Sequence, residues 1–155
     1  MYAVLILVSA LAFAAVLHRI RCLRRSSRAD AALRCYVHAA SVVIVLVWLS
    51  MLCQEAVLLL SGAWTLATGL PLHLCAVMGL LTAPALLGKG NFCWQLSLYL
   101  GMAGALAALL FPCPFLGAFP FLARLSFGLL HTLLLFSPLL PLAMGRRPAP
   151  RAALS

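Results

Sequence analysis

Long runs of apolar residues fill this sequence and leave little room for charged ones. Hydrophobic residues make up 66% of the 155 positions and charged residues 8%, whereas about a quarter of a soluble chain is usually charged. Such a chain cannot cover its surface with polar groups in water, so we expect a membrane protein. A helix needs ~20 apolar residues to cross a ~30 Å hydrocarbon layer, which allows at most about seven crossings.

The apolar residues fall into five separate runs, each near the length of one crossing. Backbone N–H and C=O groups in hydrocarbon must bond within the protein, and these runs lack the alternating polarity of barrel strands. The sequence predicts an all-α fold, a polytopic membrane helical bundle in one domain over 1–145, followed by a short basic cytoplasmic tail over 146–155. The five predicted transmembrane helices cover about residues 1–18, 35–61, 70–87, 91–111 and 121–142.

Positive charges predict how the bundle is oriented. Six arginines lie between the first two runs, and such charges mark cytoplasmic loops. Counting crossings from that loop places ten of the eleven Lys+Arg residues inside and Arg124 alone near the outer face. We expect the N-terminus outside and the C-terminus inside, in the cell membrane, with a bacterial plasma membrane as the setting.

The net charge of +9 has a ready explanation in this topology. The charges flank apolar runs, where they orient the chain and contact anionic lipid. We therefore expect membrane lipids as partners and no nucleic acid.

Six cysteines are many for this length, yet their spacing does not indicate a metal site. No two form a CxxC pair and no His cluster has the close spacing of a zinc site, so we expect neither a metal ion nor another cofactor. Most are expected to be small apolar packing residues. Cys53, Cys75 and Cys113 lie toward the outside, where an oxidising exterior could pair two of them.

Several other residues predict local packing. Pro138 and Pro141 should kink or end the last helix. Small residues around Gly101 and Gly104 should let a neighbouring helix approach closely. Trp48 falls in the middle of a run, so we expect it between helices.

Few ionisable side chains lie inside the runs, where each costs a few kcal/mol. At about 1.5 Å per residue, four of them lie roughly 5 to 15 Å inside the outer boundary. They are Glu55, His73, Arg124 and His131. They come from three different runs, so we expect a convergent polar site that opens outward. In the alternative interpretation, Glu55 and Arg124 neutralise one another and each histidine bonds a backbone carbonyl.

Cys75 lies near the predicted start of the third helix, just after Pro71. Proline suits a first helical turn, and the helix dipole there favours a thiolate. His73 is only two residues away and faces another direction, so a base from another helix, His131, is the better partner for nucleophilic catalysis. We treat Cys75 and His131 as candidate catalytic residues, and Glu55, His73 and Arg124 as candidate binding residues.

Three stretches resemble a known family. Residues 70–75 read LPLHLC and are preceded by Glu55 and by Gly62-Ala63-Trp64. They are similar to the signature of the YwaF-like multipass membrane proteins, whose relatives include the transmembrane protein 164-type acyltransferases of phospholipids. Residues 99–106 resemble that family's Gly-rich helix, and residues 126–131 resemble its His-bearing helix. The resemblance runs from about Arg34 to Pro141 and implies a catalytic thiol at Cys75 with His131 as its base.

The chain also departs from the family pattern. Members usually continue through one or two further spans, whereas this sequence ends soon after the fifth run, and Ala107 and residues 111–113 replace polar positions. We expect a chain shortened at the C-terminus, whose bundle a homo-oligomer or a membrane partner completes.

The resemblance favours a Cys-dependent phospholipid acyltransferase. Two other interpretations stay open. One is a non-enzymatic proton-linked transporter or binding protein, and the other is a structural subunit of a membrane complex.

Overall fold

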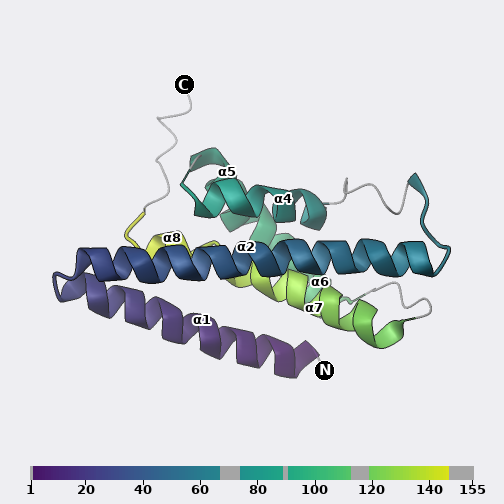
Figure 1. Cartoon of the computed structure of the whole chain (residues 1–155), viewed down its shortest axis with the longest axis horizontal. Coiled ribbons are helices and arrows are strands. Elements are labelled where there is room, and N and C mark those ends of the chain that lie inside the picture. Colours follow the sequence, from purple (N-terminus) through teal and green to yellow (C-terminus); the bar gives the residue numbers. More distant parts are fainter. Residues whose placement is uncertain (1, 67–73, 89–90, 113–118, 147–155) are drawn as a thin grey trace.

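All elements of the computed structural model are helices over the residues it describes, which are 2–66, 74–88, 91–112 and 119–146 (Figure 1). The first two apolar runs form long helices joined by a tight turn. The fourth run contains a π-helical turn, and the fifth run is divided into two helices. In chain order they are α1 (Tyr2–Arg25), α2 (Ala29–Leu60), α4 (Leu74–Leu86), α5 (Asn91–Leu96), η1 (Ser97–Gly101), α6 (Met102–Leu110), α7 (Pro120–Phe136) and α8 (Leu139–Ala143).

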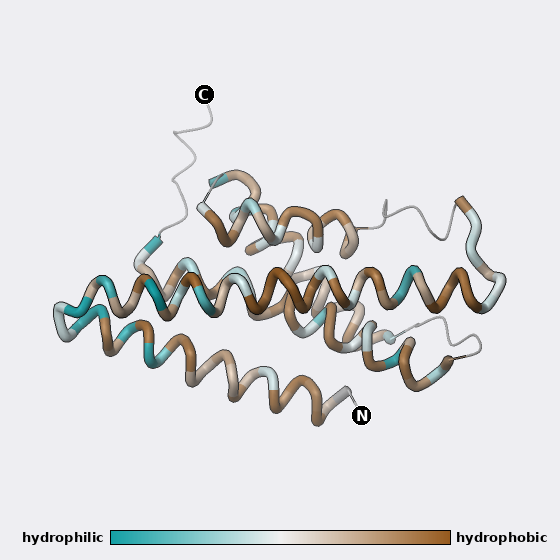
Figure 2. The backbone as a smooth tube through the Cα atoms, viewed as in Figure 1, coloured by the Kyte–Doolittle hydropathy of each residue, from teal (hydrophilic) through white to brown (hydrophobic). Residues whose placement is uncertain are grey.

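Four helical stretches in the described part are long and apolar enough to cross a membrane: Ala3–Arg25, Ala29–Leu60, Asn91–Leu110 and Pro120–Ala143. The apolar helix α4 has 13 residues, which at 1.5 Å per residue is about 20 Å. Residues 70–73, at the start of the predicted third helix, lie outside the described part. Apolar residues dominate the tube along these helices (Figure 2). The chain is therefore a multipass membrane protein.

The five predicted runs each correspond to helical structure, but the arginine-rich loop differs from the prediction. α1 continues to Arg25 and α2 begins at Ala29, so the turn between them contains only residues 26–28. Arginine is a good helix former, and its aliphatic stem can lie along the helix while the charge reaches water. Hydropathy shows where an apolar run ends, but α1 and α2 continue beyond the ends of their apolar runs.

The fifth apolar segment, which contains α7 and α8, is the most deeply buried of the four candidate spans. Of its most apolar stretch, within Pro120–Ala143, 61% is buried, against 11% for the corresponding stretch of Ala3–Arg25. α7 packs against α1, α2, α4 and α6, and its Leu130 and Leu133 share a core with Val43 of α2. α1 contacts it through Phe13 and Phe136, whose ring centroids are 5.6 Å apart. A polar side chain on the inner face of α7 is consequently shielded from lipid.

Two packing predictions are confirmed. α7 ends at Phe136 and Pro138 precedes α8, because proline has no N–H to continue the helix. α4 lies close to the small residues of the fourth segment. A Cβ added to Gly101 would lie 3.6 Å from the Cγ of Met78.

The prediction for Trp48 is wrong, since 44% of its surface is exposed. Its neighbour Val47 is buried against Gly79 of α4. Successive helical residues are turned by about 100°, so Trp48 cannot face the same neighbour.

Arg146 fastens one end of the bundle. Its Nε and Nη2 donate to the Oδ1 of Asn91 at 3.0 and 2.7 Å, and its Nη1 donates to the carbonyl of Ala85 at 3.3 Å. Its guanidinium lies 5.2 Å from the ring centroid of Trp94, whose Nε1 donates to the carbonyl of Pro138 at 2.9 Å. The sequence assigned Arg146 to the tail, but it joins α4, α5 and α8. The rest of the tail, residues 147–155, lies outside the described part.

Further contacts at this end show how the helices alternate in direction. The Tyr36 hydroxyl, near the start of α2, donates to the carbonyl of Leu86 at the end of α4. Arg24, at the end of α1, lies against Gly145 after α8. We call this the arginine end. Successive apolar segments run toward it and away from it in turn, as successive membrane crossings must.

We predict that Arg146→Ala lowers the free energy of unfolding by about 1–2 kcal/mol, because three charge-assisted hydrogen bonds and the stacked guanidinium are lost. Arg146→Lys should recover less than half, since an ammonium cannot bind Asn91 with two donors. Arg28→Ala, in the exposed turn between α1 and α2, is the matched control. Denaturation in mixed micelles measures the effect, and equal loss in Arg28→Ala would contradict it.

Candidate functional site

Cys75 lies at the beginning of α4, half-buried and facing α6. A Cβ added to Gly104 would lie 3.9 Å from the Cys75 Sγ and 3.0 Å from the Cδ2 of Leu74. Glycine at position 104 therefore lets α6 approach the thiol closely. Cys53 and Cys75 are free thiols, and Cys113, the third member of the predicted oxidisable group, lies outside the described residues.

His131 lies on α7 with 4% of its surface exposed. Its Nδ1 is 2.7 Å from the carbonyl oxygen of Phe127, and its ring packs on the Phe127 ring with centroids 4.2 Å apart. A carbonyl oxygen can only accept, so Nδ1 carries the proton and Nε2 carries the lone pair of the neutral ring. The alternative interpretation, in which each histidine bonds a backbone carbonyl, predicts this bond. The same bond also orients the ring, as a general base requires.

The packing of three helices relates these two residues. α4 and α6 pack against each other, and both pack against α7. Cys75 comes from α4 beside α6, and His131 comes from the buried part of α7. The two candidate catalytic residues are thus carried by helices in direct contact.

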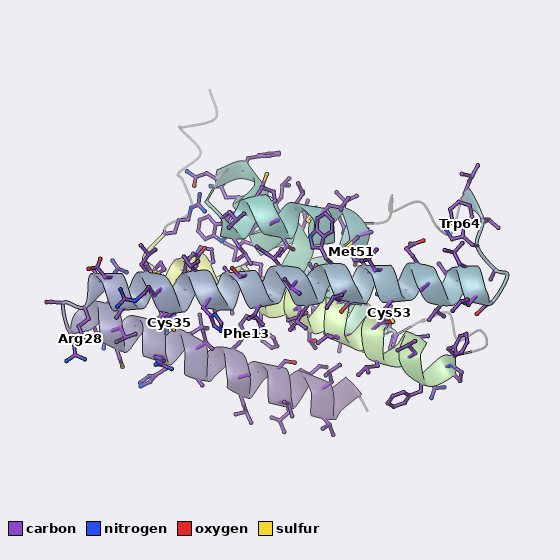
Figure 3. All side chains as sticks on the ribbon, in the orientation of Figure 1. Phe13, Arg28, Cys35, Met51, Cys53 and Trp64 are labelled. Carbon is purple, nitrogen blue, oxygen red and sulfur yellow. The ribbon has the colours of Figure 1, made fainter. Side chains whose placement is uncertain are left out.

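The structure describes two of the remaining predicted site residues, Glu55 and Arg124, and does not join them to one another. The Glu55 Oε2 accepts a hydrogen bond at 3.1 Å from Nε1 of Trp64, which Figure 3 labels above the last turns of α2. Arg124 is exposed on α7. Within the described ranges no ion pair links Glu55 to Arg124, so the predicted neutralisation is not observed. His73 lies outside the described residues.

The Glu55–Trp64 bond connects two parts of the resemblance noted above. The chain turns between them at Gly62, whose φ of +66° is readily adopted by glycine but not by other residues. Trp64 is thereby returned toward the carboxylate.

Gln54 is a further candidate residue that the sequence did not single out. Its Nε2 is buried and has no hydrogen-bond partner among the described residues. Other polar side chains in the bundle bond their own helix, among them Ser50 to the Leu46 carbonyl and Thr82 to the Met78 carbonyl. A buried amide donor without a partner costs about 1–3 kcal/mol and calls for an explanation. A glutamine in the apolar run of α2 was the available signal.

Helical geometry places Gln54 at the level of Cys75. Met51 of α2 lies against Gly79 of α4, on the side of α2 that faces α4 (Figure 3). Three residues forward from Met51 is a step of about 4.5 Å along α2, and four residues back from Gly79 is a step of about 6 Å along α4. Because the two helices are antiparallel, both steps go in the same direction. Those steps reach Gln54 and Cys75.

A π-helical turn lies beside this region. η1 ends at Gly101, one turn before Gly104, and Gly101 lies against Met78 on the face of α4 that leads to Cys75. Single π-turns inside α-helices occur frequently at functional sites.

A second Cys–His pair lies on α1. The Cys22 Sγ is 3.3 Å from Nε2 of His18, and both side chains are exposed near the arginine end. Their spacing of four residues, which puts two side chains on one helix face, was the signal for it. No group of three or more potential metal ligands is found in the described residues.

Comparison with known families gives a match that covers nearly the whole chain. The model described as the TMEM164 family matches residues 1–154. Comparison with curated proteins and with solved structures gave no match. The YwaF-like grouping and the C-terminal shortening stay predictions.

We predict that Gly104→Val lowers the free energy of unfolding by about 1–3 kcal/mol, because the added methyl groups collide with Leu74 and the Cys75 thiol. Adding Leu74→Ala should restore part of the loss. Ala103→Val, on the exposed side of α6, is the matched control. Equal stability of the two single variants in thermal unfolding would show that α4 and α6 are not in close contact here.

Proposed function

The chain belongs to the TMEM164 family, and we propose that it is a phospholipid acyltransferase that carries the acyl chain on Cys75 and uses His131 as its base. Family membership alone does not assign a reaction. The observation that carries the proposal is the fixed orientation of His131. Its Nδ1–H is held by the Phe127 carbonyl on a helix that packs against the Cys75 helix.

The first half-reaction forms a thioester. His131 Nε2 takes the thiol proton, the sulfur attacks the ester carbonyl carbon of a phospholipid, and a C–S bond forms as the C–O bond breaks. His131 then returns the proton to the leaving oxygen, which releases a lysophospholipid.

The second half-reaction reverses these steps with another lipid. The hydroxyl of a lysophospholipid gives its proton to His131 and attacks the thioester carbonyl. The new C–O bond forms as the C–S bond breaks, and the proton passes to the sulfur. Both substrates are amphiphiles that can enter between helices from the surrounding leaflet.

Gln54 fits this chemistry as the donor to the developing oxyanion. An unpartnered amide N–H₂ in an apolar bundle binds a carbonyl oxygen that becomes negative more strongly than a neutral one, which lowers the barrier. The stability given up by leaving this amide unpaired supports a role in the reaction.

In the proposed orientation the arginine end faces the cytoplasm, as the positive-inside rule requires. The N-terminus then lies outside, and the setting is a bacterial plasma membrane. Cys75, on the opposite half of α4 from the Leu86 contact at the arginine end, is then reached from the outer leaflet.

We predict that Cys75→Ala abolishes acyl transfer and that His131→Gln reduces it about 10²- to 10⁴-fold. Purified protein is incubated with a phospholipid bearing a fluorescent acyl chain and an unlabelled lysophospholipid. Cys93→Ala, another half-buried free thiol, is the control and should retain full transfer. Transfer that survives both site substitutions would exclude the proposal.

Glu55→Gln distinguishes this function from proton-linked transport. Acyl transfer should persist in this variant, because Glu55 takes no part in either half-reaction. A transporter that depends on Glu55 would lose gradient-driven uptake in proteoliposomes.

We predict that Gln54→Met lowers acyl transfer about 10²-fold while leaving the melting temperature unchanged or higher, because the unpaired buried donor is gone. Gln95→Met, at the chain's other glutamine, is the matched control and should leave transfer intact. A variant at Gln54 that keeps its activity and melts earlier would assign the residue a purely structural role.

A further inference from the structure

A groove lies between α1 and α2, and neither Cys75 nor His131 lines it. Its cavity measures about 460 Å³, within the range of about 300–1,000 Å³ that small-molecule sites occupy. Phe13 of α1 and Cys35 of α2, both of which line it, lie in the space between the two helices (Figure 3). Leu133 and Leu140 lie at its base.

Most of the groove is apolar. Val8, Ala12 and Val16 line it from α1 at four-residue intervals, and Ala39 and Leu46 line it from α2. From Val8 to Arg19 the groove extends about 16 Å along the helix at 1.5 Å per residue. Val8 is 58% exposed, so this wall is reached from the side of the bundle.

One end of the groove is basic. Arg19 of α1 and His38 of α2 line it there, close to the turn at Arg28. Both side chains are exposed, and neither forms a hydrogen bond or an ion pair with another residue in the described part of the chain. The groove therefore combines an apolar channel with a guanidinium and an imidazole at a single end.

We propose that this groove binds one anionic phospholipid, with an acyl chain along the apolar channel and the phosphate at Arg19 and His38. The channel runs parallel to two membrane-spanning helices, which is the direction of an acyl chain in a bilayer. Its basic end lies where those helices leave the apolar layer, at the depth of headgroups, and anionic headgroups attract clustered basic residues. The charge of the headgroup matches the charge of the site.

Because α1 packs weakly against the rest of the bundle, a lipid bound in the groove also has a structural effect. Only 11% of the most apolar stretch of α1 is buried, and in Figure 1 α1 separates from α2 toward the N-terminus. An acyl chain in the groove contacts both helices and supplies packing that the protein lacks there. Val47 and Met51, the residues of α2 that face α4, do not line the groove, so the lipid site is separate from the proposed acyl transfer.

Native mass spectrometry of the full chain tests the proposal. The protein is loaded with phosphatidylglycerol or phosphatidylcholine of identical chains and then washed in detergent. We expect one phosphatidylglycerol per chain to be retained in preference to phosphatidylcholine. Arg19→Gln should reduce that retention about fivefold, the effect of one basic residue at an anionic surface. Arg34→Gln, exposed at a similar depth outside the groove, should leave it unchanged.

A second pair of variants tests the apolar channel. Ala12→Phe fills the groove and should abolish the retained lipid, whereas Ala14→Phe, exposed on α1 but outside the groove, should not. Equal retention of the two lipids, or equal losses in Arg19→Gln and Arg34→Gln, would overturn the basic site. Lipid that persists in Ala12→Phe would overturn the groove. A lipid-free dimer that only Ala12→Phe disrupts would show that a second copy occupies it instead.

Discussion

Unpaired polar groups are costly in hydrocarbon, and this constraint governs the interior of the bundle. Hydroxyl groups satisfy it locally, as Thr132 does by donating to the carbonyls of Gly128 and Leu129 on its own helix. Arg146 satisfies it at the arginine end by binding two other segments. The buried amide nitrogen of Gln54 is the exception in the described part of the chain. An exception of this kind, at the level of a free thiol, is the physical basis of the proposed site.

The burial of α7 connects the fold to this site. Because α7 contacts α1, α2, α4 and α6, His131 lies inside the protein, although it belongs to a helical stretch, Pro120–Ala143, that is long enough to span a membrane. The bond to the Phe127 carbonyl then fixes which nitrogen is basic. α1 has the opposite character. It packs loosely and is exposed to lipid, so the groove that it forms with α2 suits a bound lipid more than catalysis.

The sequence predicts the helices well because the length and spacing of apolar runs reflect the thickness of the membrane. Pro138 and Gly104 also act as predicted. Proline interrupts the last helix because it has no N–H, and glycine lets α4 approach because it has no side chain. The ends of α1 and α2 are missed because arginine continues a helix beyond the apolar layer. Helix rotation is missed as well, which explains the outcomes for Trp48 and for the expected Glu55–Arg124 pair. Runs of similar hydropathy all around do not specify which face turns inward.

Locating the acyl group during turnover tests directly whether Cys75 carries it. Protein incubated with a phospholipid donor and no acceptor is digested and sequenced by tandem mass spectrometry. We expect a hydroxylamine-labile acyl thioester on Cys75 that disappears when a lysophospholipid is added. An acyl group found on Cys22, beside His18, with Cys75 unmodified would contradict it.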